Sequence, residues 1–183
     1  MTRTAPAAPS ARVPEIDTVV QSPLWQSEPD AEATVVRAIL AAAARCDHCP
    51  AGAEVAVVLS DDAAVQMLNR DWRGLDQPTN VLSFPAAKSA SRDAPAILGD
   101  VVIAYETVAR EAASEGKRFA EHLAHLAVHG FLHLLGYDHR DDEEAEVMER
   151  LEAGVLAELG ISDPYAAAGH DPAAKRVLPI GDA

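Results

Sequence analysis

The chain has 183 residues, of which 49% are hydrophobic, and a formal net charge of −14 at pH 7. This length and composition predict one domain with a substantial core, and no apolar run approaches the roughly 20 residues of a membrane-spanning helix. The acidic balance argues against a general nucleic-acid-binding protein. The N-terminus lacks the apolar segment of a signal peptide, so we expect a cytoplasmic protein without membrane contact.

The first half of the chain alternates short apolar runs with helical patterns. Ser60, Asp61 and Asp62 directly follow an apolar run and are suited to cap and begin a helix. In chain order, we predict a disordered tail over 1–13, a strand over 13–20, a helix over 31–45, a strand over 54–59, a helix over 62–71, a polar loop over 72–80 and a strand over 80–84.

The second half of the chain is mainly helical. Residues 138–158 hold nine acidic residues and two arginines, a pattern most simply explained by a solvated helix face. In chain order, we predict a mobile loop over 86–96, a strand over 98–104, a helix to about 115, a histidine-bearing helix over 118–135, an acidic helix over 141–159 and a loose tail over 164–183. Together these elements predict one α+β domain over 14–163, in which a small mixed sheet of about four strands packs with about five helices.

Residues 129–139, H-G-F-L-H-L-L-G-Y-D-H, carry most of the functional information. His129 and His133 stand four residues apart and therefore share one face of a helix. Gly136 provides the left-handed residue that ends a helix, so the chain can return His139 toward the other two imidazoles. Three protein ligands with an open fourth position are typical of a catalytic zinc site, which predicts one Zn²⁺ ion on these three histidines.

The spacing is that of the metzincin proteases, H-E-x-x-H-x-x-G-x-x-H, so we predict a metzincin-like metal helix. One position differs, because Gly130 stands where those proteases have the glutamate that acts as general base. Glycine cannot accept a proton from water, which argues against a peptidase. Zinc can lower the pKa of a bound water to about 7, so another hydrolytic reaction would tolerate glycine at this position.

Two further residues near the motif are expected behind the metal ligands or beside the substrate. His125 lies one helical turn before the first ligand, which favours hydrogen bonding behind the ligands or a place on the substrate side. Asp138 is an alternative third ligand, or a hydrogen-bond partner of a ligating imidazole. Between Asp138 and His139 we favour His139 as the ligand.

Cys46 and Cys49 form a C-D-H-C sequence with His48 between them. A reactive thiolate is favoured at the N-terminus of a helix, whereas this pair follows an alanine-rich helix, at the wrong end of its dipole. We therefore interpret both as incidental surface or loop cysteines rather than as a redox or metal site.

Three segments resemble the YbeY family of bacterial rRNA-maturation endoribonucleases, in the family's order and spacing. They are H-G-F-L-H-L-L-G-Y-D-H at 129–139, N-R-D-W-R-G-L-D-Q-P-T-N-V-L-S-F-P at 69–85 and L-G-D-V-V-I at 98–103. The resemblance covers about residues 50–160 and implies a small mixed sheet with flanking helices. It also implies Zn²⁺ on His129, His133 and His139, and it matches Arg73 to the family's arginine associated with RNA cleavage.

The activity that the resemblance implies is metal-dependent, single-strand-specific endoribonuclease action. The implied role is 16S rRNA 3′-end maturation and ribosome quality control, with single-stranded rRNA as substrate, ribosome or small-subunit proteins as further partners, and no DNA. Two alternatives stay open, namely a metal hydrolase of another substrate and a non-catalytic ribosome-assembly factor with a structural zinc.

The residues themselves suit phosphodiester chemistry. Cleavage places additional negative charge on phosphoryl oxygens, which an arginine can bind through two hydrogen bonds. Arg73 lies in a predicted loop that contains glycine and proline, a suitable place for a side chain that contacts substrate. Asp100 lies in a strand dominated by valine and isoleucine, where it either orients Arg73 or ends the strand.

Overall fold

The computed structural model describes residues 13–87, 96–139 and 141–166, and its centre is a four-stranded mixed sheet. The strands lie in the order β1-β2-β4-β3. The first three in that order are parallel, and β3 is an antiparallel edge strand beside β4. Their bounds are β1 (Glu15–Val20), β2 (Glu54–Ser60), β3 (Val81–Pro85) and β4 (Ile97–Ala104).

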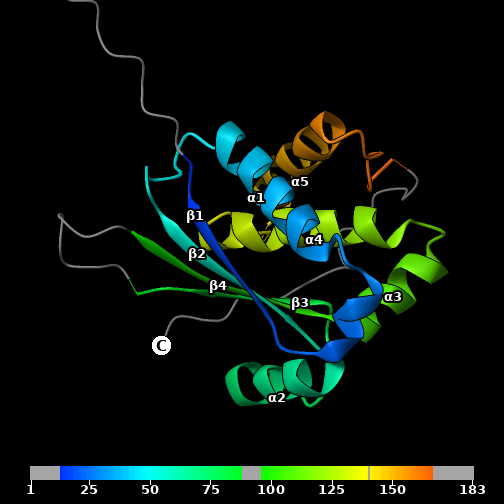
Figure 1. Ribbon diagram of the computed structural model, residues 1–183. Coiled ribbons are helices and arrows are strands. Elements are labelled where there is room, and N and C mark those ends of the chain that lie inside the picture. The colour runs from blue at the N-terminus through cyan, green and yellow to red at the C-terminus, as the bar shows by residue number, and fades with distance from the viewer. Residues whose placement is uncertain (1–12, 88–95, 140, 167–183) are drawn as a thin grey trace, which may run out of the picture.

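Helices cover both faces of this sheet (Figure 1). The long helices α1, α4 and α5 form a layer over one face, and α2 packs on the opposite face. The bounds are α1 (Ala31–Arg45), α2 (Asp62–Arg73), α3 (Tyr105–Ser114), α4 (Phe119–Leu134) and α5 (Asp142–Glu158), with a short 3-10 helix, η1 (Pro23–Ser27). This arrangement is the predicted α+β fold, with a mixed sheet of four strands and five α-helices in the part of the chain that the structure describes.

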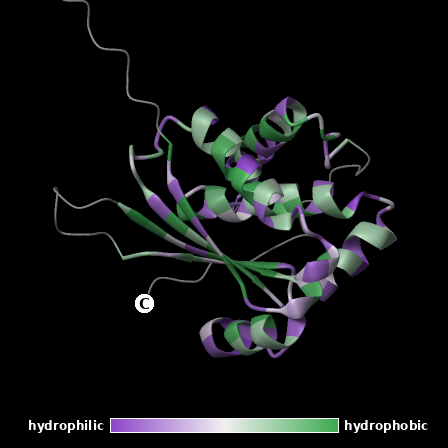
Figure 2. Ribbon diagram, viewed as in Figure 1, coloured by the Kyte–Doolittle hydropathy of each residue, from purple (hydrophilic) through white to green (hydrophobic). Residues whose placement is uncertain are grey.

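The interior has two apolar clusters, one on each face of the sheet. The larger one lies between the sheet and the three-helix layer and contains Val57, Val101 and Ile103 from the strands. The smaller one lies under α2 and joins Val65 to Leu82. Figure 2 shows the hydrophobic residues concentrated along the strands, as expected for a sheet covered on both faces.

α4 is the central helix of the molecule, and its burial holds its histidines in place. Every residue from His122 to Leu134 is buried except His129, whose side chain is 13% exposed. The helix packs against α1, α3, α5, β3 and β4. A helix enclosed on so many sides cannot rotate without opening close-packed contacts, so its histidines project in fixed directions.

The predicted helices and strands are confirmed, with their ends within two residues of the predicted ones. The helix predicted to end at 71 continues through Trp72 and Arg73, which had been assigned to a loop. It stops at Gly74, whose φ of 72° only glycine adopts readily. η1 was not predicted. The predicted tails and the 86–96 loop lie almost entirely outside the described residues, and the domain limits of 14 and 163 stay predictions.

Candidate metal centre

Three histidines converge at the C-terminal end of α4. His129 and His133 occupy consecutive turns of the helix, and the chain then reverses at Gly136, whose φ is 89°. The backbone N–H of Gly136 donates to the carbonyl oxygen of His133 at 3.0 Å, which closes the end of the helix. The reversal returns His139 to the other two, so the candidate ligand atoms of the three side chains all lie within 4.8 Å of one another.

Hydrogen bonds fix the orientation of the first two rings. Nδ1 of His129 donates to Oε1 of Glu152 at 2.7 Å, and Nδ1 of His133 donates to the carbonyl oxygen of Tyr137 at 3.0 Å. Because a carbonyl or an ionised carboxylate can only accept, each Nδ1 carries the hydrogen and each Nε2 keeps a lone pair. Nε2 of His139 is also buried and has no hydrogen-bond partner among the described residues.

These three nitrogens fit a cation. The Nε2 atoms of His129 and His133 lie 3.1 Å apart, so in neutral rings two lone pairs face each other at a repulsive distance. Burial and the neighbouring His129 and His139 lower the pKa of His133 to about 3, so His133 does not relieve this repulsion by taking up a proton near neutral pH. A transition-metal ion between the rings would relieve it, and three neutral imidazoles are a donor set that such ions accept.

Gly130 is explained by close packing between α4 and the sheet. A Cβ atom at this position would lie 2.7 Å from Cγ1 of Val101 and 3.1 Å from Oγ of Ser83. The Ser83 hydroxyl donates to the carbonyl oxygen of Gly130 at 3.0 Å, which ties the helix to β3 at the same point. A glutamate here would have to displace the helix from the sheet. The argument against a peptidase therefore gains a structural reason.

A buried acid beside the three histidines was missed by sequence analysis. Glu152 of α5 is 0% exposed, although the acids at the start of α5 are exposed as a solvated face requires. Burial raises the pKa of Glu152, but its electrostatic interaction with His129 and the hydrogen bonds from His125 and His129 outweigh burial and hold the pKa below its ordinary value. The sequence does contain an indication that Glu152 is buried, because Glu152 shares helical spacing with Met148 and Val155 on the apolar face of α5.

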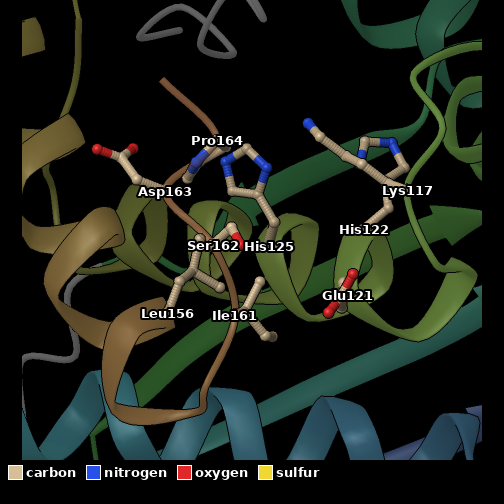
Figure 3. Close-up of a pocket in the computed structure, with 9 residues that line it drawn as sticks. All are labelled: Lys117, Glu121, His122, His125, Leu156, Ile161, Ser162, Asp163 and Pro164. Atoms are coloured by element: carbon tan, nitrogen blue, oxygen red, sulfur yellow. The ribbon is translucent and has the colours of Figure 1, made fainter. Parts of the chain in front are cut away.

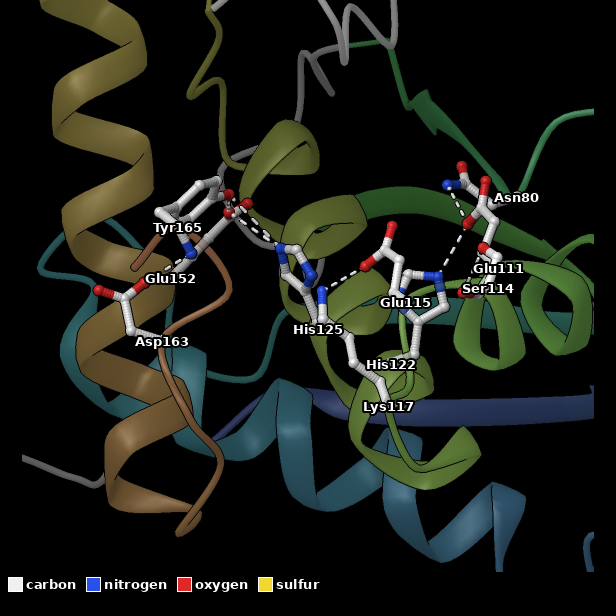
Figure 4. A network of polar contacts seen from close by, with 10 residues as sticks. All are labelled: Asn80, Glu111, Ser114, Glu115, Lys117, His122, His125, Glu152, Asp163 and Tyr165. Atoms are coloured by element: carbon white, nitrogen blue, oxygen red, sulfur yellow. Dashed lines mark hydrogen bonds and ion pairs between the residues drawn. The ribbon is translucent and has the colours of Figure 1, made fainter. Parts of the chain in front are cut away.

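The row of imidazoles continues toward the start of α4 (Figure 4). Nε2 of His125 donates to Oε2 of Glu152 at 3.3 Å, so His125 meets the first candidate ligand through a shared carboxylate. Nε2 of His122 donates to Oε2 of Glu111 at 2.8 Å, and that oxygen also accepts from Nδ2 of Asn80 at 2.9 Å. Burial raises the pKa of Glu111, but these two hydrogen bonds bring it below its ordinary value.

A pocket lies beside this row, lined by His122, His125 and Lys117 among others (Figure 3). Nδ1 of each of the two histidines is buried and has no hydrogen-bond partner among the described residues. Because Nε2 of His125 donates to a carboxylate, Nδ1 of its neutral ring is an acceptor. Burial lowers the pKa of His125, which keeps its ring neutral.

Arg73 is the last residue of α2, and α2 covers the face of the sheet opposite to α4. Its Nε atom is buried and has no hydrogen-bond partner in the described ranges, and burial lowers its pKa. Asp100 does not end its strand, because β4 continues to Ala104, and that expectation was wrong. Nor does any hydrogen bond or ion pair join Asp100 to Arg73 among the residues described.

Asp138 and the two cysteines take structural positions. Oδ1 of Asp138 accepts from the backbone N–H of His139 at 2.8 Å, and Asp138 is not part of the group of three converging ligands. Cys46 and Cys49 lie in the turn after α1, and no disulfide joins them. Of the two expected positions, surface or loop, the loop is confirmed and the surface is wrong, because both residues are 2% exposed and belong to the core. Burial raises the pKa of the Cys46 thiol.

Comparison with known proteins identifies the family. The family model described as Endoribonuclease YbeY matches residues 22–160. Endoribonuclease YbeY of Rhodopseudomonas palustris strain BisA53 is 59% identical over 156 residues, covering 84% of this chain and 91% of that protein. Endoribonuclease YbeY of Bradyrhizobium sp. strain BTAi1 is 54% identical over 162 residues, covering 86% of this chain and 96% of that protein.

One solved structure is also similar, the solution structure of TM1509 from Thermotoga maritima. It is 23% identical with a TM-score of 0.47, covering 81% of this chain and 97% of that one. Within the described residues, no helix is both long enough and apolar enough to span a membrane. The family match over most of the chain, together with relatives above 50% identity, shows that this protein belongs to the endoribonuclease YbeY family.

Proposed function

We propose that this protein is a zinc-dependent endoribonuclease specific for single-stranded RNA, acting in the cytoplasm in 16S rRNA 3′-end maturation and ribosome quality control. Its family supports RNA as the substrate, because the relatives are named endoribonucleases. The observation that carries the metal-dependent reaction is the convergence of three imidazoles, two of whose Nε2 atoms lie 3.1 Å apart.

His129, His133 and His139 would hold the ion, and three protein ligands would leave a coordination position open. A bound zinc ion would supply a Lewis acid that polarises a phosphoryl oxygen. The chain's own residues fix the ring orientations through Glu152 and the carbonyl of Tyr137, so the site is ordered before a substrate arrives.

Arg73 would bind the negative charge of the substrate. The partly buried guanidinium has an Nε that has lost water and finds no acceptor among the described residues, so an anionic group that supplies one is favoured. A phosphodiester offers such oxygens, and its charge grows during cleavage.

Trp72 supports a single-stranded substrate. Its side chain is in contact with Phe84, with ring centroids 5.9 Å apart at 73°, yet the residue is 63% exposed. An anchored, exposed aromatic ring can stack an unpaired base without reading its identity. A duplex keeps its bases stacked on one another, so it would not offer a base to this ring.

The acidic surface supports a role for a second partner. A net charge of −14 opposes general attraction to RNA. We therefore propose that ribosome or small-subunit proteins help to bring the enzyme to its rRNA, and we expect no activity on DNA.

The test is cleavage of a fluorescently labelled single-stranded rRNA fragment by the purified protein and three variants. We expect His129→Ala to abolish cleavage and Arg73→Ala to slow it by about 10²–10³-fold, as for loss of a charge-stabilising group. Arg70→Ala is the matched control, because Arg70 is an exposed arginine of the same helix paired with Asp71. It should cleave at close to the wild-type rate.

Three other results would contradict the proposal. Cleavage that survives both His129→Ala and Arg73→Ala would indicate a contaminating nuclease. Hydrolysis of casein but not RNA would favour a metal hydrolase of another substrate. Normal rRNA processing in cells carrying Arg73→Ala, combined with unfolding on zinc removal, would favour a ribosome-assembly factor with a structural zinc.

A further inference from the structure

The carboxylate of Glu152 ties the candidate ligands to the rest of the fold. Its Oε1 accepts from Nδ1 of His129 at 2.7 Å, and its Oε2 accepts from Nε2 of His125 at 3.3 Å. The hydroxyl of Tyr165, in the segment after α5, also donates to Oε2 (Figure 4). A fully buried carboxylate is costly unless several donors bind its oxygens, and these three side chains supply them.

This carboxylate also decides which nitrogen of His129 carries the hydrogen. An ionised carboxylate can only accept, so His129 donates from Nδ1 and keeps a lone pair on Nε2. In the other tautomer Nε2 would carry the hydrogen and the ring could not bind a cation on that side. A carboxylate behind a ligating imidazole also orients the ring and makes its free nitrogen a stronger ligand.

We propose that Glu152 is a positioning residue of the metal centre, which holds His129 in its ligating tautomer and is itself held by Tyr165. Metal affinity then depends on α5 and on the segment that follows it, although neither supplies a ligand. This inference rests on the proposed ligand set of His129, His133 and His139. Glu152 acts through His129, and it does not contact the substrate.

The first test is zinc affinity, measured on the full chain by competition with a fluorescent chelator. We expect Glu152→Ala to weaken zinc binding by about 10–100-fold, the usual loss when a partner behind a ligand is removed. Glu152→Gln keeps an acceptor oxygen for His129, so it should lose less than about tenfold. Glu146→Gln is the matched control, because Glu146 is an exposed acid of the same helix, and it should bind zinc like the wild type.

His139→Ala separates failure of this inference from failure of the ligand set. It removes a proposed ligand and should abolish tight zinc binding. If His139→Ala binds zinc like the wild type, the ligand set and the proposed zinc dependence are wrong. If His139→Ala loses zinc while Glu152→Ala stays within about twofold of wild type, only the positioning role of Glu152 is wrong.

The second test reads the tautomer directly and does not depend on activity. In metal-free protein labelled with nitrogen-15 histidine, NMR should show His129 protonated at Nδ1 in the wild type and a substantial Nε2–H population in Glu152→Ala. Tyr165→Phe should keep the fold and weaken zinc binding by about twofold to fivefold, a smaller loss than removal of the carboxylate itself. If Glu152→Ala does not fold, wild-type zinc affinity in both Glu152→Gln and Tyr165→Phe would overturn the proposal.

Discussion

Replacement of Gly130 by alanine should destabilise the protein although it adds a good helix former. The new Cβ would lie 2.7 Å from Cγ1 of Val101, whereas carbon atoms pack best at about 3.5–4.0 Å. The helix or the valine must therefore shift by roughly 1 Å, and overpacking of this kind costs about 1–3 kcal/mol. Alanine recovers about 1 kcal/mol of helix propensity, so the net loss should be roughly 1 kcal/mol.

A double-mutant cycle with Val101→Ala isolates this contact. Without the valine methyl groups the shortest contact is removed, while the tight approaches to Oγ of Ser83 at 3.1 Å and Cγ2 of Val81 at 3.3 Å remain, so Gly130→Ala should cost less than in the wild type and come close to neutral. Urea unfolding of the metal-free variants, followed by circular dichroism, measures each free energy of unfolding. Gly154→Ala is the matched control, because its Cβ would meet only the flexible end of Arg45, and it should be stabilising. Additivity of Gly130→Ala and Val101→Ala within about 0.5 kcal/mol would refute the packing argument.

Three other outcomes follow from side chains that are buried or partly buried. The folded-state pKa of Glu111 is below its ordinary value of 4.5. The ionised carboxylate therefore stabilises the fold fully above pH 4.5, and this stabilisation is lost as the pH falls through the folded-state pKa. Below about pH 4.5 the free energy of unfolding should therefore fall less steeply with decreasing pH for Glu111→Gln than for wild type. Equal slopes in the two proteins would contradict this. Trp25→Phe removes the Nε1–H that donates to the buried carbonyl oxygen of Ser60 at 2.8 Å, and urea unfolding should show a loss of about 1–3 kcal/mol; a loss below the error of the measurement would contradict it. Cys46 and Cys49 should react with a thiol reagent only as the native protein opens, so fast labelling of the folded chain would be inconsistent with their burial.

Local signals explain why so much of the fold was predictable. The cap at Asp61, whose Oδ1 accepts from the backbone N–H of Ala64 at 3.0 Å, and the helix-ending Gly136 act over a few residues. The spacing of the histidines on α4 acts over the same range. Such patterns are visible in a single sequence because the residues that cause them are neighbours in the chain.

Contacts between distant segments explain what was not predicted. Glu152 stands in a run of acids whose charge indicates a solvated face, and only the packing of α5 against α4 reveals that it faces His129. The glycine at position 130 was interpreted through proton transfer, but the need for glycine comes from Val101, a residue of β4 that is distant in the chain. The order of the strands likewise depends on long-range packing, and so does the position of α2, the helix that ends at Arg73, on the face opposite to α4.

The spacing of the candidate ligands has a consequence for the order in which the centre assembles. The three histidines lie within residues 129–139, and closing so short a segment costs little chain entropy. A nascent chain that has made only α4 and its turn therefore already holds the whole proposed ligand set. Glu152 and Tyr165 emerge later and must dock across the core to reach it. Under the proposed ligand set, a metal ion would first be held weakly by a local turn, and completion of the domain would convert that weak encounter into stable retention.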